Sequence, residues 1–209
     1  MKTYLFDFDG TLVDSMPSYA AATIRILEEN QVPYPEDIVK ITTPLGYQGV
    51  AELYVTMGLP MTVPEIVSTL QGYALADYTN TIPAKTSVKE FLEKSRREGV
   101  KLAVLTASPH AMLDVCLKRV GLYDLFDYVW SSDDFGLKKS QPEIYLAAAE
   151  RLGADISEIT FFDDNITALK TAKRAGLRTV GVFDASSADC ADEIKATADG
   201  YILSFGELL

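Results

Sequence analysis

Apolar and polar positions follow two different patterns along the chain. After Pro83, short apolar runs alternate with segments whose apolar residues recur at helical spacing. Another apolar run starts at Tyr4, becomes acidic and opens into a loop at Gly10, which indicates a buried strand near the N-terminus. These patterns predict strands over residues 4–9, 101–105, 128–131, 159–162, 179–182 and 201–203, with helices over residues 109–120, 143–152 and 166–175 and a further helix that contains Val88, Phe91 and Leu92 and ends at Gly99.

Alternating strands and helices are typical of a parallel sheet covered on both faces. The expected strands are almost continuously apolar, as strands buried on both faces are. The predicted fold class is therefore α/β, with a Rossmann-like parallel-sheet core.

Residues 15–80 interrupt this core with a different pattern. A helix begins at Ser15-Met16-Pro17, and the rest of the stretch has helical spacing broken by several prolines, with no convincing strand. We therefore expect an all-helical domain over residues 15–80, inserted into a core made of residues 1–14 and 81–209. Asp14, Ser15 and the region near Asn80 are the expected hinge connections.

Composition narrows the class of protein. The chain has 209 residues, of which 48% are hydrophobic, and it contains no run of about twenty apolar residues that predicts a membrane span. The N-terminus lacks the apolar region of a signal peptide, and the two cysteines, Cys116 and Cys190, fit a reduced compartment, so we expect a cytoplasmic protein. The net charge of −11 disfavours nucleic acid and anionic membranes as partners, and an anionic substrate needs local positive charge from a lysine or a metal.

The candidate chemistry lies where the strands end, because ligands of parallel sheets bind beyond the carboxyl ends of the strands. Asp7 and Asp9 follow the first expected strand, and two like charges this close are costly unless a cation or a proton compensates them. They suggest a nucleophile and an acid/base on one loop. The alternative is structural, since aspartates after a strand often form a turn or cap a helix.

A second acidic pair, Asp163 and Asp164, ends a separate expected strand. Either Asp164 or Asn165 is able to cap the following helix, which is the structural alternative for this pair. Together with Asp7 and Asp9, the pair assembles an oxygen-rich site suited to Mg²⁺.

Two further loops offer groups that bind phosphate. Thr106 and Ser108 lie at a helix start, where a hydroxyl and unpaired backbone N–H groups suit a phosphate oxygen. One lysine of Lys138-Lys139 is able to reach the same phosphate as a point charge, although such a pair is also common on a solvated surface.

These motifs resemble those of the haloacid dehalogenase superfamily of phosphatases. Asp7-Phe8-Asp9-Gly10-Thr11-Leu12 is similar to the first motif, and Thr106 to the second. Lys139 in Lys-Ser-Gln-Pro-Glu-Ile-Tyr is similar to the third, and Asp163-Asp164-Asn165 to the fourth. The resemblance covers nearly the whole chain, and it makes residues 15–80 similar to the family's helical cap.

The resemblance implies a covalent mechanism. Asp7 attacks phosphorus to form an aspartyl phosphate, and Asp9 protonates the leaving group and then activates water. Mg²⁺ is implied as the cofactor, held by Asp7, the Asp9 carbonyl and Asp164, with Asp163 as a further metal or supporting ligand. The remaining phosphate oxygens are implied to bind Thr106, the Ala107 N–H and Lys139, with Lys138 as the alternative lysine.

The resemblance also limits which reactions of the superfamily are expected for this chain. Asp9 argues against dehalogenase chemistry, and Asp-Gly-Thr-Leu-Val-Asp-Ser-Met-Pro resembles the phosphoglycolate phosphatase branch. We therefore expect a Mg²⁺-dependent phosphatase, monomeric or homodimeric, acting on a small phosphorylated metabolite that is phosphoglycolate-like or a sugar phosphate.

Two alternatives remain. A sugar-phosphate mutase of the beta-phosphoglucomutase type shares the cap, but such mutases usually carry a histidine near the position of Tyr19 and basic cap residues, of which this segment has only Arg25 and Lys40. An inactive binding or regulatory protein on the same fold is the other. His110 is expected on the surface or in a loop, and Tyr47 and Gln48 are either specificity residues or part of an exposed loop.

Overall fold

The computed structural model describes residues 2–209, which form two compact units. One unit runs to Asp14 and resumes from Pro83 to Leu209, and the other spans Ser15–Ile82. The second unit ends two residues beyond the expected boundary at residue 80, because the N–H groups of Thr81 and Ile82 both donate to the Asp77 carbonyl and extend the last helical turn.

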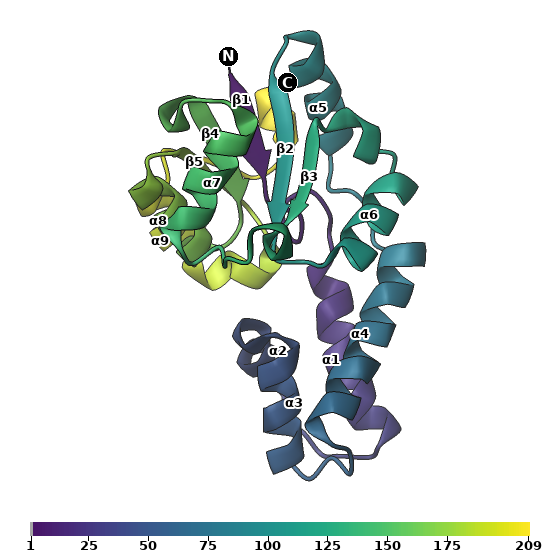
Figure 1. Cartoon of the computed structure of the whole chain (residues 1–209). Helices are drawn as coiled ribbons and strands as arrows, with labels where there is room; N and C mark the ends of the chain where they lie inside the picture. Colours follow the sequence, from purple (N-terminus) through teal and green to yellow (C-terminus); the bar gives the residue numbers. More distant parts are fainter. Residues whose placement is uncertain (1) are drawn as a thin grey trace. The chain divides into compact units, whose positions relative to one another are not determined.

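The first unit is built on a six-stranded parallel sheet in the order β3-β2-β1-β4-β5-β6 (Figure 1). β1 lies in the middle, so that Leu5 is in register with Ala103 on one side and with Phe161 on the other. The strands are β1 (Thr3–Phe6), β2 (Lys101–Thr106), β3 (Tyr128–Ser131), β4 (Ile159–Asp163), β5 (Arg178–Val182) and β6 (Gly200–Ile202).

Helices connect the strands and cover the sheet, which confirms the predicted α/β class. Helix α9 was not predicted, because Ile194 is its only buried residue and leaves no apolar period to recognise. The α-helices of this unit are α5 (Val88–Arg97), α6 (His110–Arg119), α7 (Pro142–Leu152), α8 (Ile166–Ala175) and α9 (Ala191–Thr197). The 3₁₀ turns are η2 (Tyr123–Leu125), η3 (Ser132–Phe135), η4 (Ile156–Glu158), η5 (Ala185–Cys190) and η6 (Phe205–Leu208).

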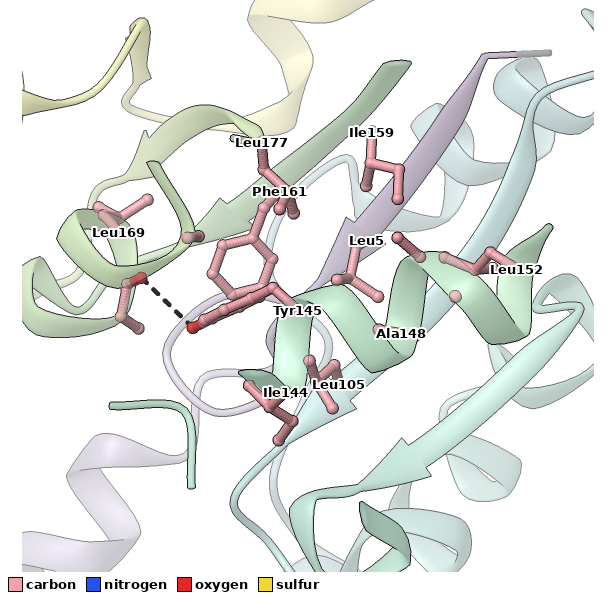
Figure 2. Close-up of a cluster of buried hydrophobic side chains, with 14 of the residues drawn as sticks. Leu5, Leu105, Ile144, Tyr145, Ala148, Leu152, Ile159, Phe161, Leu169 and Leu177 are labelled. Carbon is pink, nitrogen blue, oxygen red and sulfur yellow. Dashed lines mark hydrogen bonds between the residues drawn. The ribbon is translucent and has the colours of Figure 1, made fainter. Parts of the chain in front are cut away.

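Successive side chains along the central strands point to opposite faces of the sheet and form a core on each face. Leu5 and Phe161 point to the face where α7 and α8 pack, and Tyr145 of α7 fills the space between these helices and the sheet (Figure 2). On the other face, Phe6 stacks on Phe162 with ring centroids 4.9 Å apart. Because both faces are buried, the polar groups of this unit concentrate at the ends of the strands.

The inserted unit is all-helical, as predicted. Tyr54 is fully buried in its core and donates a hydrogen bond to the Thr23 carbonyl at 2.9 Å. Thr62 and Glu65 form a reciprocal capping box at the start of the longest helix. Its elements are α1 (Met16–Glu29), α2 (Ile38–Thr42), η1 (Thr43–Leu45), α3 (Gly46–Thr56) and α4 (Val63–Asn80). Within residues 2–209, no helix has the length and apolar character needed to cross a membrane.

Candidate active site

The loop after β1 is a tight turn built around Phe8. The N–H groups of Leu12 and Val13 donate to the Phe8 carbonyl at 2.9 and 3.1 Å, and the Phe8 side chain is fully buried. The Asp7 N–H still donates to Phe162 on β4 at 2.9 Å. The sheet therefore fixes the start of the loop and the buried ring fixes its middle, which gives Asp7 and Asp9 defined positions beyond the strand.

Three carboxylates from two strands meet at this edge of the sheet. Asp7, Asp163 and Asp164 each offer an oxygen within 4.8 Å of the others, and all three side chains are buried. Asp9 is not part of this cluster, and its Oδ2 accepts a hydrogen bond from the Ser108 hydroxyl at 2.5 Å. The structure therefore brings Asp7 together with the second acidic pair, whereas Asp9 contacts the loop after β2.

Lys139 supplies positive charge to this cluster. Its Nζ lies 2.6 Å from Asp7 Oδ1 and 2.5 Å from Asp163 Oδ2, and the lysine side chain is only 12% exposed. Lys138 is exposed, so of the two candidate lysines Lys139 is the one that contacts the acidic cluster. The backbone explains the choice, because the Tyr145 hydroxyl lies 3.0 Å from the Lys139 carbonyl and holds the segment against the core.

The charges of this cluster perturb one another strongly. Burial raises the pKa of Asp163 to about 7, although the neighbouring charge of Lys139 lowers it. Burial, followed by the charges of Asp163 and Asp7, raises the pKa of Asp164 well above its ordinary value. Burial alone lowers the pKa of Lys139, but the charges of Asp163 and Asp7 outweigh that effect and raise it. One ammonium group therefore faces three carboxylates, an arrangement that favours an additional cation.

The fourth motif positions its residues through local hydrogen bonds. Asp163 Oδ1 accepts from the Asn165 N–H at 2.6 Å, and the Asn165 side chain caps α8 by accepting from the Thr167 N–H at 2.9 Å. Asn165 thus takes the capping role that the sequence left open between it and Asp164. Asp164 accepts from the Thr11 hydroxyl at 3.0 Å, which links the first and fourth motifs.

The donor set fits Mg²⁺. Three buried carboxylates offer oxygens within 4.8 Å of one another, and hard oxygen ligands of this kind are those that Mg²⁺ prefers. Asp7, Asp163 and Asp164 are the side chains able to hold the ion. Bound there, it compensates the excess negative charge and polarises phosphoryl oxygens.

The loop after β2 faces the same region. Thr106 is buried at the end of β2, and its Oγ1 accepts from the Ser108 N–H at 3.1 Å. Ala107 is exposed, and together with Lys138 and Lys139 it lines a cavity of about 630 Å³. The Ala107 backbone and Lys139 therefore share an open space in which a phosphate group fits.

Other candidate residues have partners within their own units. His110 opens α6, and its ring nitrogens lie 3.0 Å from Asp114 and 2.8 Å from Asp134, so it joins α6 to η3. Tyr19 and Tyr47 belong to the helical unit, where their rings pack 5.6 Å apart.

Three contributors were not singled out from the sequence: Thr11, Tyr145 and Lys85. Thr11 lies inside the first motif, where its contact with Asp164 gives no separate signal. Ser108 was expected to bind phosphate, and its hydroxyl donates to Asp9 instead. Tyr145 lies three residues after Pro142, where an aromatic residue also fits an ordinary helix core. Lys85 contacts the loop after β1 and gives no sequence signal, because its partners lie far along the chain.

A family model described as haloacid dehalogenase-like hydrolase matches residues 1–176. The chain belongs to this family. The predicted resemblance is confirmed. Residues of its first, third and fourth motifs meet in one cluster, which contains Asp7, Lys139, Asp163 and Asp164.

Several of the curated relatives are named as phosphatases. The phosphorylated carbohydrates phosphatase of Thermotoga maritima is 30% identical over 189 residues, which cover 86% of this chain and 84% of that protein. The phosphoglycolate phosphatase of Pectobacterium atrosepticum is 28% identical, with coverage of 85% and 78%. A solved Thermotoga maritima structure named as a candidate beta-phosphoglucomutase superposes with a TM-score of 0.83 at 26% identity, covering 100% of this chain and 97% of that one.

Proposed function

We propose that this haloacid dehalogenase-family enzyme is a Mg²⁺-dependent phosphatase that hydrolyses a small phosphate monoester through an aspartyl phosphate on Asp7. The observation that carries the proposal is the buried cluster in which Asp7 lies 2.6 Å from Lys139 and within 4.8 Å of two further carboxylates. A buried carboxylate that faces a phosphate site is suited to act as a nucleophile.

The steps are assigned to residues that the fold already holds in place. An Asp7 oxygen attacks phosphorus as the bond to the leaving oxygen breaks, and Asp9 gives its proton to that oxygen. Asp9 then takes a proton from water, the hydroxide attacks phosphorus, and phosphate leaves as the Asp7 carboxylate is restored. The Ser108 hydroxyl, which donates to Asp9, orients this acid/base.

The phosphoryl oxygens are held by groups from three loops. Lys139 contributes an ammonium group whose position is set by Asp7 and Asp163. Thr106 and the Ala107 N–H contribute neutral donors at the end of β2. When bound at the carboxylate cluster, Mg²⁺ supplies the charge that lets an anionic nucleophile approach an anionic phosphate. Donors fixed before the reaction stabilise the transferring group without reorganising.

The composition of the helical unit favours an uncharged leaving group. Between residues 15 and 80 the sequence has seven acidic residues and two basic ones, Arg25 and Lys40. Arg25 pairs with Glu29 at 2.7 Å, which uses one of the two cations. A sugar or polyol phosphate therefore suits the chain better than phosphoglycolate, whose second anionic group needs its own partner. The carbohydrate phosphatase among the relatives agrees with this choice.

A sugar-phosphate mutase is the second candidate, favoured by the likeness to the Thermotoga maritima structure. The two reactions differ in the fate of the phosphoryl group. A phosphatase transfers it to water, whereas a mutase returns it to a second hydroxyl of a sugar and releases no phosphate.

The decisive experiment measures phosphate release and product identity over a panel of sugar phosphates and phosphoglycolate, with and without Mg²⁺. We expect Mg²⁺-dependent phosphate release that Asp7→Asn abolishes and Asp192→Asn leaves intact, because the Asp192 side chain is fully exposed. Mass spectrometry of acid-quenched enzyme should show one added phosphoryl group on the peptide that contains Asp7. Substrate isomerisation without phosphate release would establish the mutase instead, and activity surviving Asp7→Asn would exclude the covalent route.

A further inference from the structure

Lys85 makes three hydrogen bonds at the base of the catalytic loop. Its Nζ donates to the Gly10 carbonyl at 2.6 Å, to the Phe183 carbonyl at 2.7 Å and to Asp184 Oδ2 at 2.9 Å. An ammonium group has three protons, so these acceptors use all of its donors. The Lys85 side chain is 18% exposed and that of Asp184 is 4% exposed, which makes the ion pair largely buried.

The backbone beside Lys85 is held to the same loop. The Lys85 N–H donates to the Leu12 carbonyl at 2.9 Å, and the Asp14 N–H donates to Pro83 at 3.0 Å. Val13 and Ala84 form an antiparallel bridge between these contacts. The segment that carries Lys85 is therefore registered against the end of the catalytic loop, and the side chain reaches forward from it to Gly10.

Gly10 is where a small displacement would disturb the acidic cluster. It adopts a φ of +73°, and a Cβ atom there would lie 2.7 Å from Asp164 Oδ2. The backbone of Gly10 therefore lies directly against the carboxylate. Its N–H donates to the Val13 carbonyl at 3.0 Å, which fixes the peptide shared with Asp9, and Lys85 fixes the next peptide through the Gly10 carbonyl.

Charge favours a lysine paired with an aspartate at this position. Lys85 and Asp184 together are neutral, so the contact adds no net charge beside the carboxylate cluster. Asp184 also accepts from the Ser186 N–H at 2.9 Å and the Ser186 hydroxyl at 2.6 Å, which fixes it at the end of β5. Lys85 therefore transmits the position of a rigid strand end to the loop after β1.

We propose that Lys85 is a positioning residue for the phosphatase reaction, which holds the Gly10 peptide and through it the Asp9 backbone and the Asp164 carboxylate. Lys85 takes no part in bond making, and it acts by keeping the first motif in register with the fourth. This role rests on the proposed function, whereas the restraint on residues 8–13 is a property of the metal-free protein and is measured separately.

The test compares Lys85→Met with Lys173→Met. Lys173 is a matched control because it also bridges a carboxylate and a carbonyl, Asp199 at 2.7 Å and Thr197 at 2.8 Å, away from the acidic cluster. Small misplacements of catalytic groups are costly, so we expect kcat for phosphate release to fall about 10- to 100-fold in Lys85→Met while KM changes less than about threefold. In the metal-free protein, amide hydrogen exchange over residues 8–13 should accelerate in Lys85→Met and not in Lys173→Met.

Conservative variants separate positioning from simple loss of packing. A cavity of about 390 Å³ borders Lys85, so the larger Lys85→Arg side chain has room and should restore most of kcat and the slow exchange. If Lys85→Met does not fold, Lys85→Gln keeps an amide NH₂ group with two donors and should show a smaller fall in kcat at unchanged KM. Normal kcat, or reduced kcat with unchanged exchange over residues 8–13, would overturn the proposal. Absence of phosphate release from the unaltered enzyme would refute the proposed function alone, because the exchange measurement does not depend on it.

Discussion

Replacing Lys139 with methionine removes the one ammonium group that pairs with Asp7 and Asp163. Methionine keeps an unbranched apolar chain of similar length, so the change chiefly deletes charge and hydrogen bonding. In the metal-free protein, the Asp7, Asp163 and Asp164 carboxylates then remain buried without a compensating cation.

The expected loss of stability follows from this imbalance. Deleting one partner of a buried ion pair costs about 3–5 kcal/mol, because the other charge stays desolvated. Lys139 pairs with two carboxylates and is itself mostly buried, which places Lys139→Met within that range near pH 8. The exposed pair of Lys173 and Asp199 serves as the control, and its loss should cost only about 0–1 kcal/mol.

The loss of stability in Lys139→Met should depend on pH, and the titration of Asp163 determines whether it grows or shrinks as the pH rises. The pKa of Asp163 is raised to about 7 in the folded protein, so its contribution to stability is complete below its unfolded pKa and declines as pH rises through about 7. Lys139→Met removes the positive charge that lowers the pKa of Asp163. The free energy of unfolding therefore falls further in this variant as the pH rises. At about pH 5.5 Asp163 is protonated in the variant and most of the penalty disappears.

Urea denaturation followed by circular dichroism measures this effect. The free energy of unfolding would be compared for the unaltered protein, Lys139→Met and Lys173→Met at about pH 5.5 and pH 8, with chelator and with saturating Mg²⁺. We expect the deficit of Lys139→Met to be largest at the higher pH without metal and smaller with Mg²⁺. A deficit equal at both pH values, or no larger than that of Lys173→Met, would refute the electrostatic reasoning.

Three further changes test other parts of the structure. Gly10→Ala places a Cβ atom 2.7 Å from Asp164 Oδ2 at a residue with a positive φ. Calorimetry should therefore show weaker Mg²⁺ binding and a lower melting temperature. Unchanged values for both would contradict this packing. Asp164→Asn removes a buried carboxyl group whose pKa is raised by burial. The metal-free protein should therefore have a higher melting temperature, while phosphate release is lost. A lower melting temperature would show that the buried carboxylate does not destabilise the metal-free protein. His110→Ala removes a ring whose pKa is raised by hydrogen bonds to Asp114 and then Asp134, so its stabilisation is complete below about pH 6.5 and lost above the folded pKa. The loss in melting temperature should therefore be larger at about pH 5.5 than at pH 8.5, and the reverse order would exclude the imidazolium contacts.

The sheet could be predicted from the sequence because its strands are nearly all apolar. The expected strand over residues 128–131 matches β3, and the expected helix over residues 166–175 matches α8. The first strand is shorter than expected and ends at Phe6, since the chain turns around Phe8 and pairs instead with its own loop. Short polar elements such as α9 bury too little surface to leave a pattern.

The acidic and basic residues of the candidate site were predictable as a set, whereas their individual contacts were not. Choosing Lys139 over Lys138 requires knowing which residue the Tyr145 hydroxyl holds against the core, and that contact is tertiary. Lys85 was beyond prediction, because its partners Gly10 and Asp184 lie 75 and 99 residues away and meet it only in the folded sheet.

The central place of β1 has a consequence for how the chain folds. β1 precedes β2, which begins at Lys101, and β4, which begins at Ile159, and it pairs with both strands. Contacts between residues so far apart in sequence form late, because the entropic cost of closing a long loop comes before the strand pairing that offsets it. β1 therefore lacks its partner strands until they have been made, whereas the helical unit, Ser15–Ile82, makes its contacts within a shorter segment and is able to form earlier. Unpaired strand edges during synthesis are therefore concentrated in β1, the strand that leads to Asp7.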